Sequence, residues 1–388
     1  MDLKTLDSAF VAPTYRRFPL EIVSGSGSVV FDEKGSRYID LTSGIGVTAF
    51  GVADPVWQEA VTAQIGLVQH MSNLYYTAPC AKLAALLCEK TGFEKVFFSN
   101  SGAEANECAI KVARKYAADK YGSDHFTIAT LDGSFHGRTL TTLAATGQEH
   151  YHELFQPLTP GFIHIPPTMD ALRAAAKEHK LAALMIECIQ GEGGVIDLPQ
   201  DFVRQARAFT EENDILLICD EVQTGNGRTG ALYAYMHYGV MPDVVSTAKG
   251  LAGGLPLGAT LLSEKVQHTL GYGDHGSTFG GNPVCCAAAL SVLHRIDDAL
   301  LTDVRAKSDR LRAAFDGADG IVSVSGMGLM LGLKTVKPAS EIVASLLDRG
   351  VLCLTAKDKV RLLPALNIPL ELLLEAAETI KDVCRVSG

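Results

Sequence analysis

The middle of the chain alternates short, almost wholly apolar runs with longer stretches of helical periodicity. The apolar runs are 94–98, 125–131, 181–188, 214–219 and 243–247, and helices are predicted between them, including 104–122 and 201–213. Strands that are apolar on both faces are typical of parallel sheets, because the βαβ crossovers cover both faces with helices. The alternation therefore predicts an α/β fold whose large domain is a mostly parallel sheet sandwiched by helices.

The two ends of the chain differ from this middle region. The elements predicted there are a β-hairpin at 27–31 and 36–41, an extended run at 322–333 and a last helix at 370–386. A chain of 388 residues is long enough for two domains. We expect residues 51–290 to form the large domain, and residues 1–50 and 291–388 to build a smaller α+β domain from both chain ends.

Composition excludes several classes of protein. The chain has 34 Lys and Arg against 44 Asp and Glu, for a net charge of −10, and no basic block suited to nucleic acid. Its nine cysteines are odd in number and contain no C-x-x-C pair, which favours free thiols in a reducing compartment. No apolar run approaches the roughly 18 residues of a membrane helix, and the N-terminus lacks the apolar segment of a signal peptide. We expect a cytoplasmic enzyme that binds neither nucleic acid nor membrane.

Each apolar run of the middle region leads into a cluster of glycines and functional side chains. These clusters are 99–104, 132–138, 190–194, 220–223 and 248–250. Turns at strand ends need Gly, Asp and Ser anyway, which would explain any one cluster alone. In an open α/β sheet, however, ligands bind beyond the carboxyl ends of the strands. Five clusters of this content therefore predict one shared site.

Three of the clusters together favour a pyridoxal phosphate enzyme. Residues 101–103 open a helix directly after a strand, where backbone N–H groups can bind a phosphate, although a simple helix cap is the alternative. Lys249 follows an apolar strand, so burial should disfavour its ammonium, as a Schiff-base lysine requires; a surface lysine is the alternative. Asp220 ends another buried strand, where it would keep the pyridine nitrogen of the cofactor protonated.

Two other phosphate-binding classes and a metal site fit the sequence less well. An NTPase also needs G-x-x-x-x-G-K-[ST], and the chain contains no Gly-Lys dipeptide. G-x-G-x-x-G occurs at 225–230 and 271–276, but neither match begins at the tight turn of a strand end that a dinucleotide site requires. His150 and His152 have ligand spacing without an evident third ligand, so we expect a solvated loop there and no metal.

Taken together, the segments resemble the class III (subgroup II) pyridoxal-phosphate aminotransferases. The resemblance runs from about residue 15 to residue 361 and is carried by YRRFP, SNSGAEANECAIKVARK, SFHGRTL, ECIQGEGG, LLICDEVQTGNGRTG, PDVVSTAKGLAGGLPLGA, GSTFGGNPV and VRLLPAL. It implies PLP fold-type I architecture, pyridoxal 5'-phosphate as cofactor, and a homodimer with active sites at the interface. The chain departs from the usual G-H-x-H-P at 51–55 and from E-P-I-Q at 187–190, and neither departure replaces an implied site residue.

The resemblance also implies which residues bind the cofactor. Lys249 would bind it covalently and then move the proton between substrate and cofactor, and Asp220 would pair with the ring nitrogen. The other implied residues are Gln223 at the ring hydroxyl, Phe135 stacked on the ring, Ser101, Gly102 and Ala103 at the phosphate, and the partner subunit's Thr278, also at the phosphate.

Two arginines are expected to bind substrate carboxylates. Glutamate reacts at the carbon that bears a carboxylate, so it needs one anion receptor near the cofactor and another farther out. A donor that reacts at a terminal amine has no carboxylate there, so the near receptor must be silenced by an anion, because arginine cannot deprotonate. The resemblance implies that Arg138 is the far receptor, Arg361 the near one, and Glu192 the mask of Arg361. Exposure in the basic stretch 357–361 is the alternative for Arg361.

The resemblance leads us to expect transfer of a terminal amino group from N-acetylornithine to 2-oxoglutarate, giving N-acetylglutamate semialdehyde and glutamate, a step of arginine biosynthesis. Ornithine, succinylornithine, N-succinyl-diaminopimelate and GABA remain alternative donors. An aminomutase of the glutamate-semialdehyde type would share Lys249 and Asp220 but would have less use for the Arg361–Glu192 switch. A non-enzymatic scaffold is disfavoured because no implied catalytic position is lost.

Overall fold

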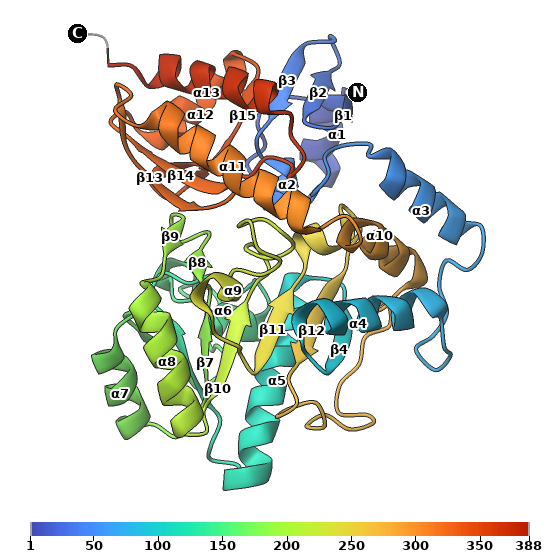
Figure 1. Cartoon of the computed structure of the whole chain (residues 1–388), viewed down its shortest axis with the longest axis vertical. Helices are drawn as coiled ribbons and strands as arrows, with labels where there is room; N and C mark the ends of the chain where they lie inside the picture. Colours follow the sequence, from blue (N-terminus) through green and yellow to red (C-terminus); the bar gives the residue numbers. More distant parts are fainter. Residues whose placement is uncertain (1, 387–388) are drawn as a thin grey trace.

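The computed structural model describes residues 2–386, and its centre is a seven-stranded sheet (Figure 1). The strand order is β4-β12-β11-β10-β7-β5-β6. The bounds are β4 (Lys95–Ser99), β5 (Thr127–Leu131), β6 (Phe162–Ile165), β7 (Leu181–Ile186), β10 (Leu216–Asp220), β11 (Val244–Thr247) and β12 (Gly258–Leu262). Of these seven strands, β12 runs antiparallel to both its neighbours and the other pairings are parallel. The predicted mostly parallel sheet is confirmed.

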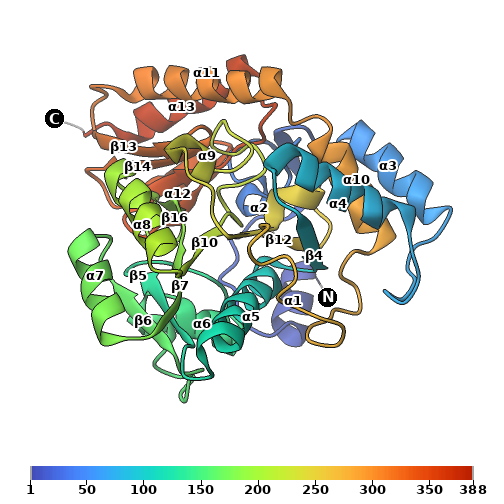
Figure 2. The same ribbon diagram turned by 60° about the horizontal axis from the view of Figure 1, so that its bottom comes forward.

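Helices cover both faces of this sheet, as Figures 1 and 2 show. They include α4 (Ala78–Thr91), α5 (Gly102–Tyr121), α7 (Met169–Glu178), α8 (Gln200–Glu212) and α10 (Pro283–Leu293). Alternate residues of β10 belong to different apolar clusters: Leu216 and Ile218 share one with α5, and Leu217 and Cys219 share the other with α7 and α8. Burial on both faces explains why the strands are apolar throughout rather than alternating.

The two chain ends meet in a second, four-stranded sheet of order β1-β2-β3-β15. Its strands are β1 (Ile22–Ser26), β2 (Val29–Asp32), β3 (Arg37–Asp40) and β15 (Val351–Leu352). The antiparallel pair β2–β3 confirms the predicted hairpin, and β15 pairs in parallel with β3. This pairing supports a small domain built from both ends, while the boundaries 1–50, 51–290 and 291–388 stay a prediction.

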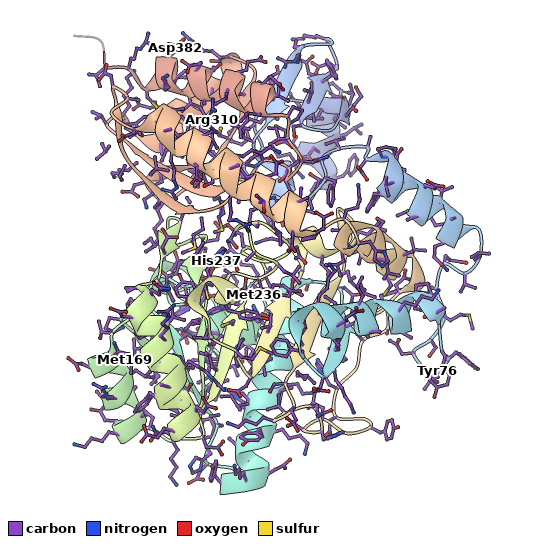
Figure 3. All side chains as sticks on the ribbon, in the orientation of Figure 1. Tyr76, Met169, Met236, His237, Arg310 and Asp382 are labelled. Carbon is purple, nitrogen blue, oxygen red and sulfur yellow. The ribbon has the colours of Figure 1, made fainter. Side chains whose placement is uncertain are left out.

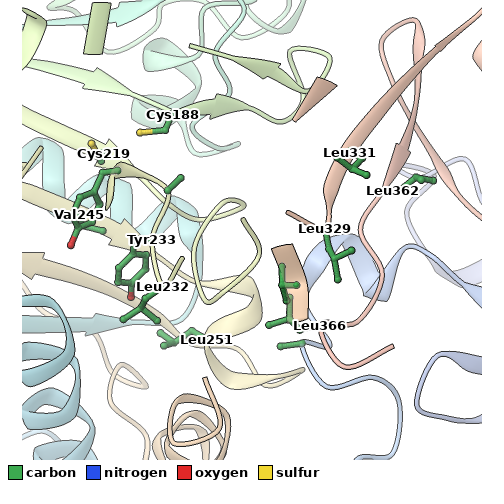
Figure 4. Close-up of a cluster of buried hydrophobic side chains, with 14 of the residues drawn as sticks. Cys188, Cys219, Leu232, Tyr233, Val245, Leu251, Leu329, Leu331, Leu362 and Leu366 are labelled. Atoms are coloured by element: carbon green, nitrogen blue, oxygen red, sulfur yellow. The ribbon is translucent and has the colours of Figure 1, made fainter. Parts of the chain in front are cut away.

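A third sheet, of order β13-β14-β17-β16, lies beside the large one. Its strands are β13 (Ile321–Met327), β14 (Met330–Thr335), β16 (Leu354–Ala356) and β17 (Lys359–Leu362), flanked by α11 (Asp298–Phe315), α12 (Ala339–Asp348) and α13 (Leu370–Cys384). One apolar cluster extends from Val245 and Tyr233 to Leu331 and Leu362 (Figure 4). The continuous core fixes β17 relative to the large sheet, which matters for Arg361.

Most of the remaining elements are short. They are α1 (Leu3–Phe10), α2 (Ser43–Gly46), α3 (Pro55–Ile65), α6 (Leu140–Ala145), α9 (Tyr235–Tyr238), the 3₁₀ turns η1 (Glu149–Tyr151) and η2 (Lys249–Ala252), and the small sheet of β8 (Ile189–Gln190) and β9 (Ile196–Asp197). Between α3 and α4 the chain forms a loop whose Tyr76 points outward (Figure 3).

Four sequence expectations can be compared directly with the structure. All nine cysteines are free thiols and seven are buried, which confirms that they form no disulfide framework. No helix within residues 2–386 is long and apolar enough to span a membrane. The solvated loop predicted for His152 is wrong: the side chain is buried, and its Nε2 bonds to the carbonyl oxygens of Leu143 and Thr146 at 2.9 and 2.8 Å. Within residues 2–386, no cluster of three or more His, Cys, Asp or Glu side chains could hold a metal ion.

Candidate active site

A cavity of about 600 Å³ lies at the carboxyl ends of the central strands. Four of the five predicted polar clusters contribute to its lining, at the ends of β4, β5, β10 and β11, and Glu187 lines it after β7. No residue of the fifth cluster, 190–194, lines the cavity, but Glu192 of that cluster accepts a hydrogen bond from the lining residue Gln223. The predicted site residues that line it are Ser101, Gly102, Ala103, Phe135, Arg138, Asp220, Gln223 and Lys249. These residues lie together because each stands at or just after the end of a strand, and parallel strands end at the same edge of the sheet.

Lys249 is enclosed immediately beyond β11. It begins η2 with φ of +44°, a left-handed conformation that a non-glycine residue adopts only under constraint from its surroundings. Burial lowers the pKa of its amine, although the negative charges of Glu192 and Asp220 oppose that shift. The neutral amine is therefore more accessible than on an exposed lysine, which suits attack on a carbonyl carbon.

Asp220 is held in place by a buried hydrogen-bond network. Its Oδ2 accepts from Asn106 Nδ2 and from His136 Nδ1, each at 2.8 Å, and its Oδ1 accepts from the backbone N–H of Val222 at 3.0 Å. Ser246 Oγ in turn donates to Asn106 Oδ1 at 2.5 Å. Donors on both oxygens stabilise a negative carboxylate that is almost fully buried and faces the cavity.

The start of α5 combines the two interpretations that the sequence left open. Ser101 is the N-cap, and its side chain accepts from the backbone N–H of Glu104 at 3.2 Å. Residues 101–103 also line the cavity, where the N–H groups of the first helical turn lack partners within the helix. A Cβ at Gly102 would lie 2.5 Å from Val222 Cγ1, so glycine is needed for this close approach. The helix start is both capped and able to bind an anion.

Arg361 is buried on β17 and is not the surface residue that the alternative supposed. It forms an ion pair with Glu192, and its Nη1 donates to Gln223 Oε1 at 3.2 Å. Gln223 Nε2 donates to Glu192 at 3.4 Å and closes the triangle. Burial opposes the ionisation of Glu192, but the charge and hydrogen bond of Arg361 outweigh it and lower the pKa of the carboxyl. The pair is therefore an arginine neutralised by an ionised carboxylate.

Arg138 has the opposite environment. It is exposed to the cavity and stacks on aromatic rings, with its Cζ 4.2 Å from the ring centroid of Tyr151 and 5.4 Å from that of Phe135. No carboxylate within residues 2–386 forms an ion pair with it. The two arginines implied as carboxylate receptors thus differ in availability: one is masked and one is open.

Thr278 lies away from these residues. It lines a second cavity of about 400 Å³ together with residues 70, 72–74 and 276–277, and it does not line the first cavity of its own chain. Its expected contact with a phosphate would have to be made in another subunit and stays a prediction.

The sequence motifs do not single out Glu187, His136, Asn106 or Tyr151. Glu187 is buried in the cavity wall and accepts from the backbone N–H groups of Phe135 and Gly191 at 2.8 and 3.2 Å. Burial raises the pKa of Glu187 to about 7, against the opposing charge of His136. His136, Glu187 and Asn106 lie within the segments SFHGRTL, ECIQGEGG and SNSGAEANECAIKVARK. Their closeness in sequence to the implied site residues is the one sequence feature that points to them.

Comparison with known proteins agrees with this geometry. The family described as Aminotransferase class-III matches residues 10–384. A curated acetylornithine aminotransferase of Haemophilus ducreyi is 50% identical over 369 residues, 94% of each chain, and one of Caldanaerobacter subterraneus subsp. tengcongensis is 42% identical over 386 residues, 98% of each.

Solved structures show the same similarity. The N-acetylornithine aminotransferase of Stenotrophomonas maltophilia superposes with a TM-score of 0.85 at 34% identity, covering 98% of both chains. The ornithine aminotransferase of Toxoplasma gondii superposes with a TM-score of 0.94 at 29% identity, covering 98% of this chain and 94% of that one.

Proposed function

The chain belongs to the class-III aminotransferases, which are pyridoxal-phosphate-dependent transaminases, and we propose that it transfers the terminal amino group of N-acetylornithine to 2-oxoglutarate. The products are N-acetylglutamate semialdehyde and glutamate, and the reaction belongs to arginine biosynthesis. The observation that carries the proposal is the ion pair between the buried Arg361 and the half-buried Glu192. The names of the similar proteins support the choice of donor.

The residues of the cavity fit pyridoxal phosphate. Lys249 presents an amine for the aldehyde carbon, Asp220 a buried carboxylate for the ring nitrogen, and the first turn of α5 backbone N–H groups for the phosphate. When bound, the cofactor supplies an electron-withdrawing ring that stabilises the substrate carbanion.

We assign the remaining cofactor contacts by position in the cavity wall. Ser101, Gly102 and Ala103 would hold the phosphate, and Phe135 would stack on the ring. Gln223 would reach the ring hydroxyl with the second hydrogen of its Nε2, since the first is donated to Glu192.

The ion pair explains how one site accepts two substrates with different carboxylate positions. With Arg361 neutralised by Glu192, the region next to the reacting carbon presents no free cation, which suits a donor that carries only hydrogen there. Glutamate and 2-oxoglutarate bring a carboxylate to the same place, so Glu192 must release Arg361 when they bind. Arg138 remains available for the distal carboxylate of every substrate.

The donor specificity is tested by a panel of amino donors with 2-oxoglutarate as acceptor. We expect N-acetylornithine to give the highest kcat/KM among N-acetylornithine, ornithine, succinylornithine, N-succinyl-diaminopimelate and GABA. Equal or better use of GABA or free ornithine would reject the proposed donor. Formation of glutamate in stoichiometric amounts would separate amino transfer from an aminomutase, which needs no acceptor.

Glu192→Ala should damage one half-reaction more than the other. Without the carboxylate, Arg361 faces the reacting carbon as an uncompensated cation, so we expect kcat/KM for N-acetylornithine to fall at least about tenfold further than that for glutamate, a difference of about 1.4 kcal/mol or more. Each half-reaction can be followed separately through the cofactor spectrum. Glu212→Ala on the exposed end of α8 serves as the matched control. Equal losses for both donors would contradict the masking role.

We further propose that the enzyme is a homodimer in the cytoplasm. Residues near the second cavity expose large apolar side chains, with Leu74 at 88% and Tyr76 at 107% of full exposure, and Figure 3 shows Tyr76 projecting from its loop. Pairing of two chains there would bury this surface and could bring the partner subunit's Thr278 to the phosphate. Sedimentation of the purified protein as a monomer at micromolar concentration would contradict the dimer.

A further inference from the structure

Tyr151 carries the closest contact of the Arg138 guanidinium to an aromatic ring. The Arg138 Cζ lies 4.2 Å from the Tyr151 centroid, closer than the 5.4 Å to Phe135. The two rings meet nearly edge to face, 5.8 Å apart at 68°, and form a corner around the guanidinium. Tyr151 lies 13 positions after Arg138 and 16 after Phe135, outside the SFHGRTL motif that contains both, so the contact comes from the fold.

An aromatic ring holds a guanidinium in a way that a carboxylate cannot. The ring face attracts the planar cation, while the N–H groups lie in the guanidinium plane and stay free at its edge. A carboxylate neighbour would occupy those N–H groups, as Glu192 does on Arg361. Stacking therefore restricts the orientation of Arg138 and leaves its donors available for a bidentate substrate carboxylate.

The position of Tyr151 is itself fixed by the neighbouring chain. Its backbone N–H donates to Gln148 O at 3.1 Å, and Gln148 Nε2 donates to Ser134 O at 3.1 Å, next to Phe135. On the other side, the buried His152 is bonded through Nε2 to the end of α6. The ring of His150 lies 3.9 Å from that of Tyr151. The short turn η1 is thus tied to the loop that carries Arg138.

We propose that Tyr151 is a positioning residue that orients Arg138 for the distal carboxylate of both the amino donor and the oxo acid acceptor. The proposal rests on the proposed role of Arg138 and extends it to a residue outside the motif. Because Arg138 serves both substrates, removal of the ring should weaken their binding to a similar extent. This distinguishes Tyr151 from Glu192, whose loss is expected to separate the two substrates.

The test compares Tyr151→Leu with Tyr151→Phe in separate half-reactions of the holoenzyme. Tyr151→Leu should raise the apparent dissociation constants of N-acetylornithine and of 2-oxoglutarate about 2- to 30-fold, the range of a cation–π contact, with the saturating rate changed less than about twofold. Tyr151→Phe keeps the ring and should stay within about twofold of the wild type. A Tyr151→Leu enzyme with unchanged constants, or a Tyr151→Phe enzyme as impaired as Tyr151→Leu, would overturn the proposal.

A double-mutant cycle with Arg138→Met separates failure of this proposal from failure of the proposed function. If Tyr151 acts through Arg138, adding Tyr151→Leu to Arg138→Met should cause no further loss, whereas independent, additive losses would refute the positioning role. An Arg138→Met enzyme that binds both substrates normally would refute the receptor assignment, and the positioning role with it. Because 2-oxoglutarate binding can be followed with any donor, a wrong choice of N-acetylornithine would leave this test intact.

Discussion

Lys249→Ala is expected to abolish transamination, with kcat/KM reduced at least about a thousandfold for every donor. General acid–base catalysis alone contributes about 10²- to 10⁴-fold, and Lys249 is proposed to supply both the proton-transfer group and the amine that binds the aldehyde carbon. The structure places the residue in the cavity, directly beyond a central strand, with the pKa of its amine lowered by burial. No other lysine lines the described cavity.

The visible absorbance of lysine-bound pyridoxal phosphate provides a second readout, independent of turnover. It should be present in the wild type and absent in Lys249→Ala, even when the variant is loaded with excess cofactor. Lys177→Ala is a matched control, because this lysine is exposed on α7 and lies outside the cavity. A Lys249→Ala enzyme retaining more than about a hundredth of wild-type activity, or a colourless wild type, would disprove the assignment.

The sequence predicted the central strands because burial on both faces leaves an unmistakable apolar pattern. It missed β6 and β12, for two different reasons. β6 is a half-buried edge strand interrupted by His164, so its hydrophobic signal is weak. β12 is fully buried but follows the glycine- and proline-rich stretch 250–258, and its antiparallel direction was not predicted either, because nothing in the composition of a five-residue apolar run specifies direction.

The site was predicted where it depends on strand ends and was missed where it depends on contacts between distant elements. The pairing of Arg361 with Glu192 spans 169 residues and requires the β13–β14–β17–β16 sheet to dock beside β8 and β9. Ser325 Oγ donates to Val195 O at 2.6 Å, and the Gly326 N–H donates to Asp197 at 2.8 Å, which holds that docking in place. No local pattern encodes such a contact, so only the family resemblance could imply it.

The hydrogen-bond donors to the buried Asp220 carboxylate also could not be predicted from the local sequence. A buried carboxylate must have hydrogen-bond donors, but that rule does not say which part of the chain supplies them. Here they come from α5 and from the loop after β5, 114 and 84 residues away. Asn106 looks like an ordinary helical residue in the sequence, and its role becomes visible when α5 packs across β10 and β11.

This network makes Asp220→Asn the second large effect that we expect. A neutral amide cannot keep the cofactor ring nitrogen protonated, and removal of one preorganised electrostatic group typically lowers kcat about 10²- to 10³-fold. Both half-reactions should slow by the same factor because both use the same ring as an electron sink. The absorbance of lysine-bound cofactor should persist, since Lys249 is intact, and this separates the variant from Lys249→Ala.

A loss of activity in Asp220→Asn could also come from a damaged core, and Asp243→Asn is the control for that effect. Asp243 is equally buried and accepts from Arg207 Nη1 and the Leu217 N–H at 2.8 Å each, but it lies outside the cavity. We expect Asp243→Asn to lower Tm with little change in kcat, and Asp220→Asn to lower kcat far more than its Tm shift explains.

A cofactor analogue methylated at the ring nitrogen carries the positive charge permanently, so it should restore part of the rate in Asp220→Asn. Wild-type kcat in Asp220→Asn with ordinary cofactor, or no recovery with the analogue in an otherwise folded variant, would show that the carboxylate does not act through the ring charge.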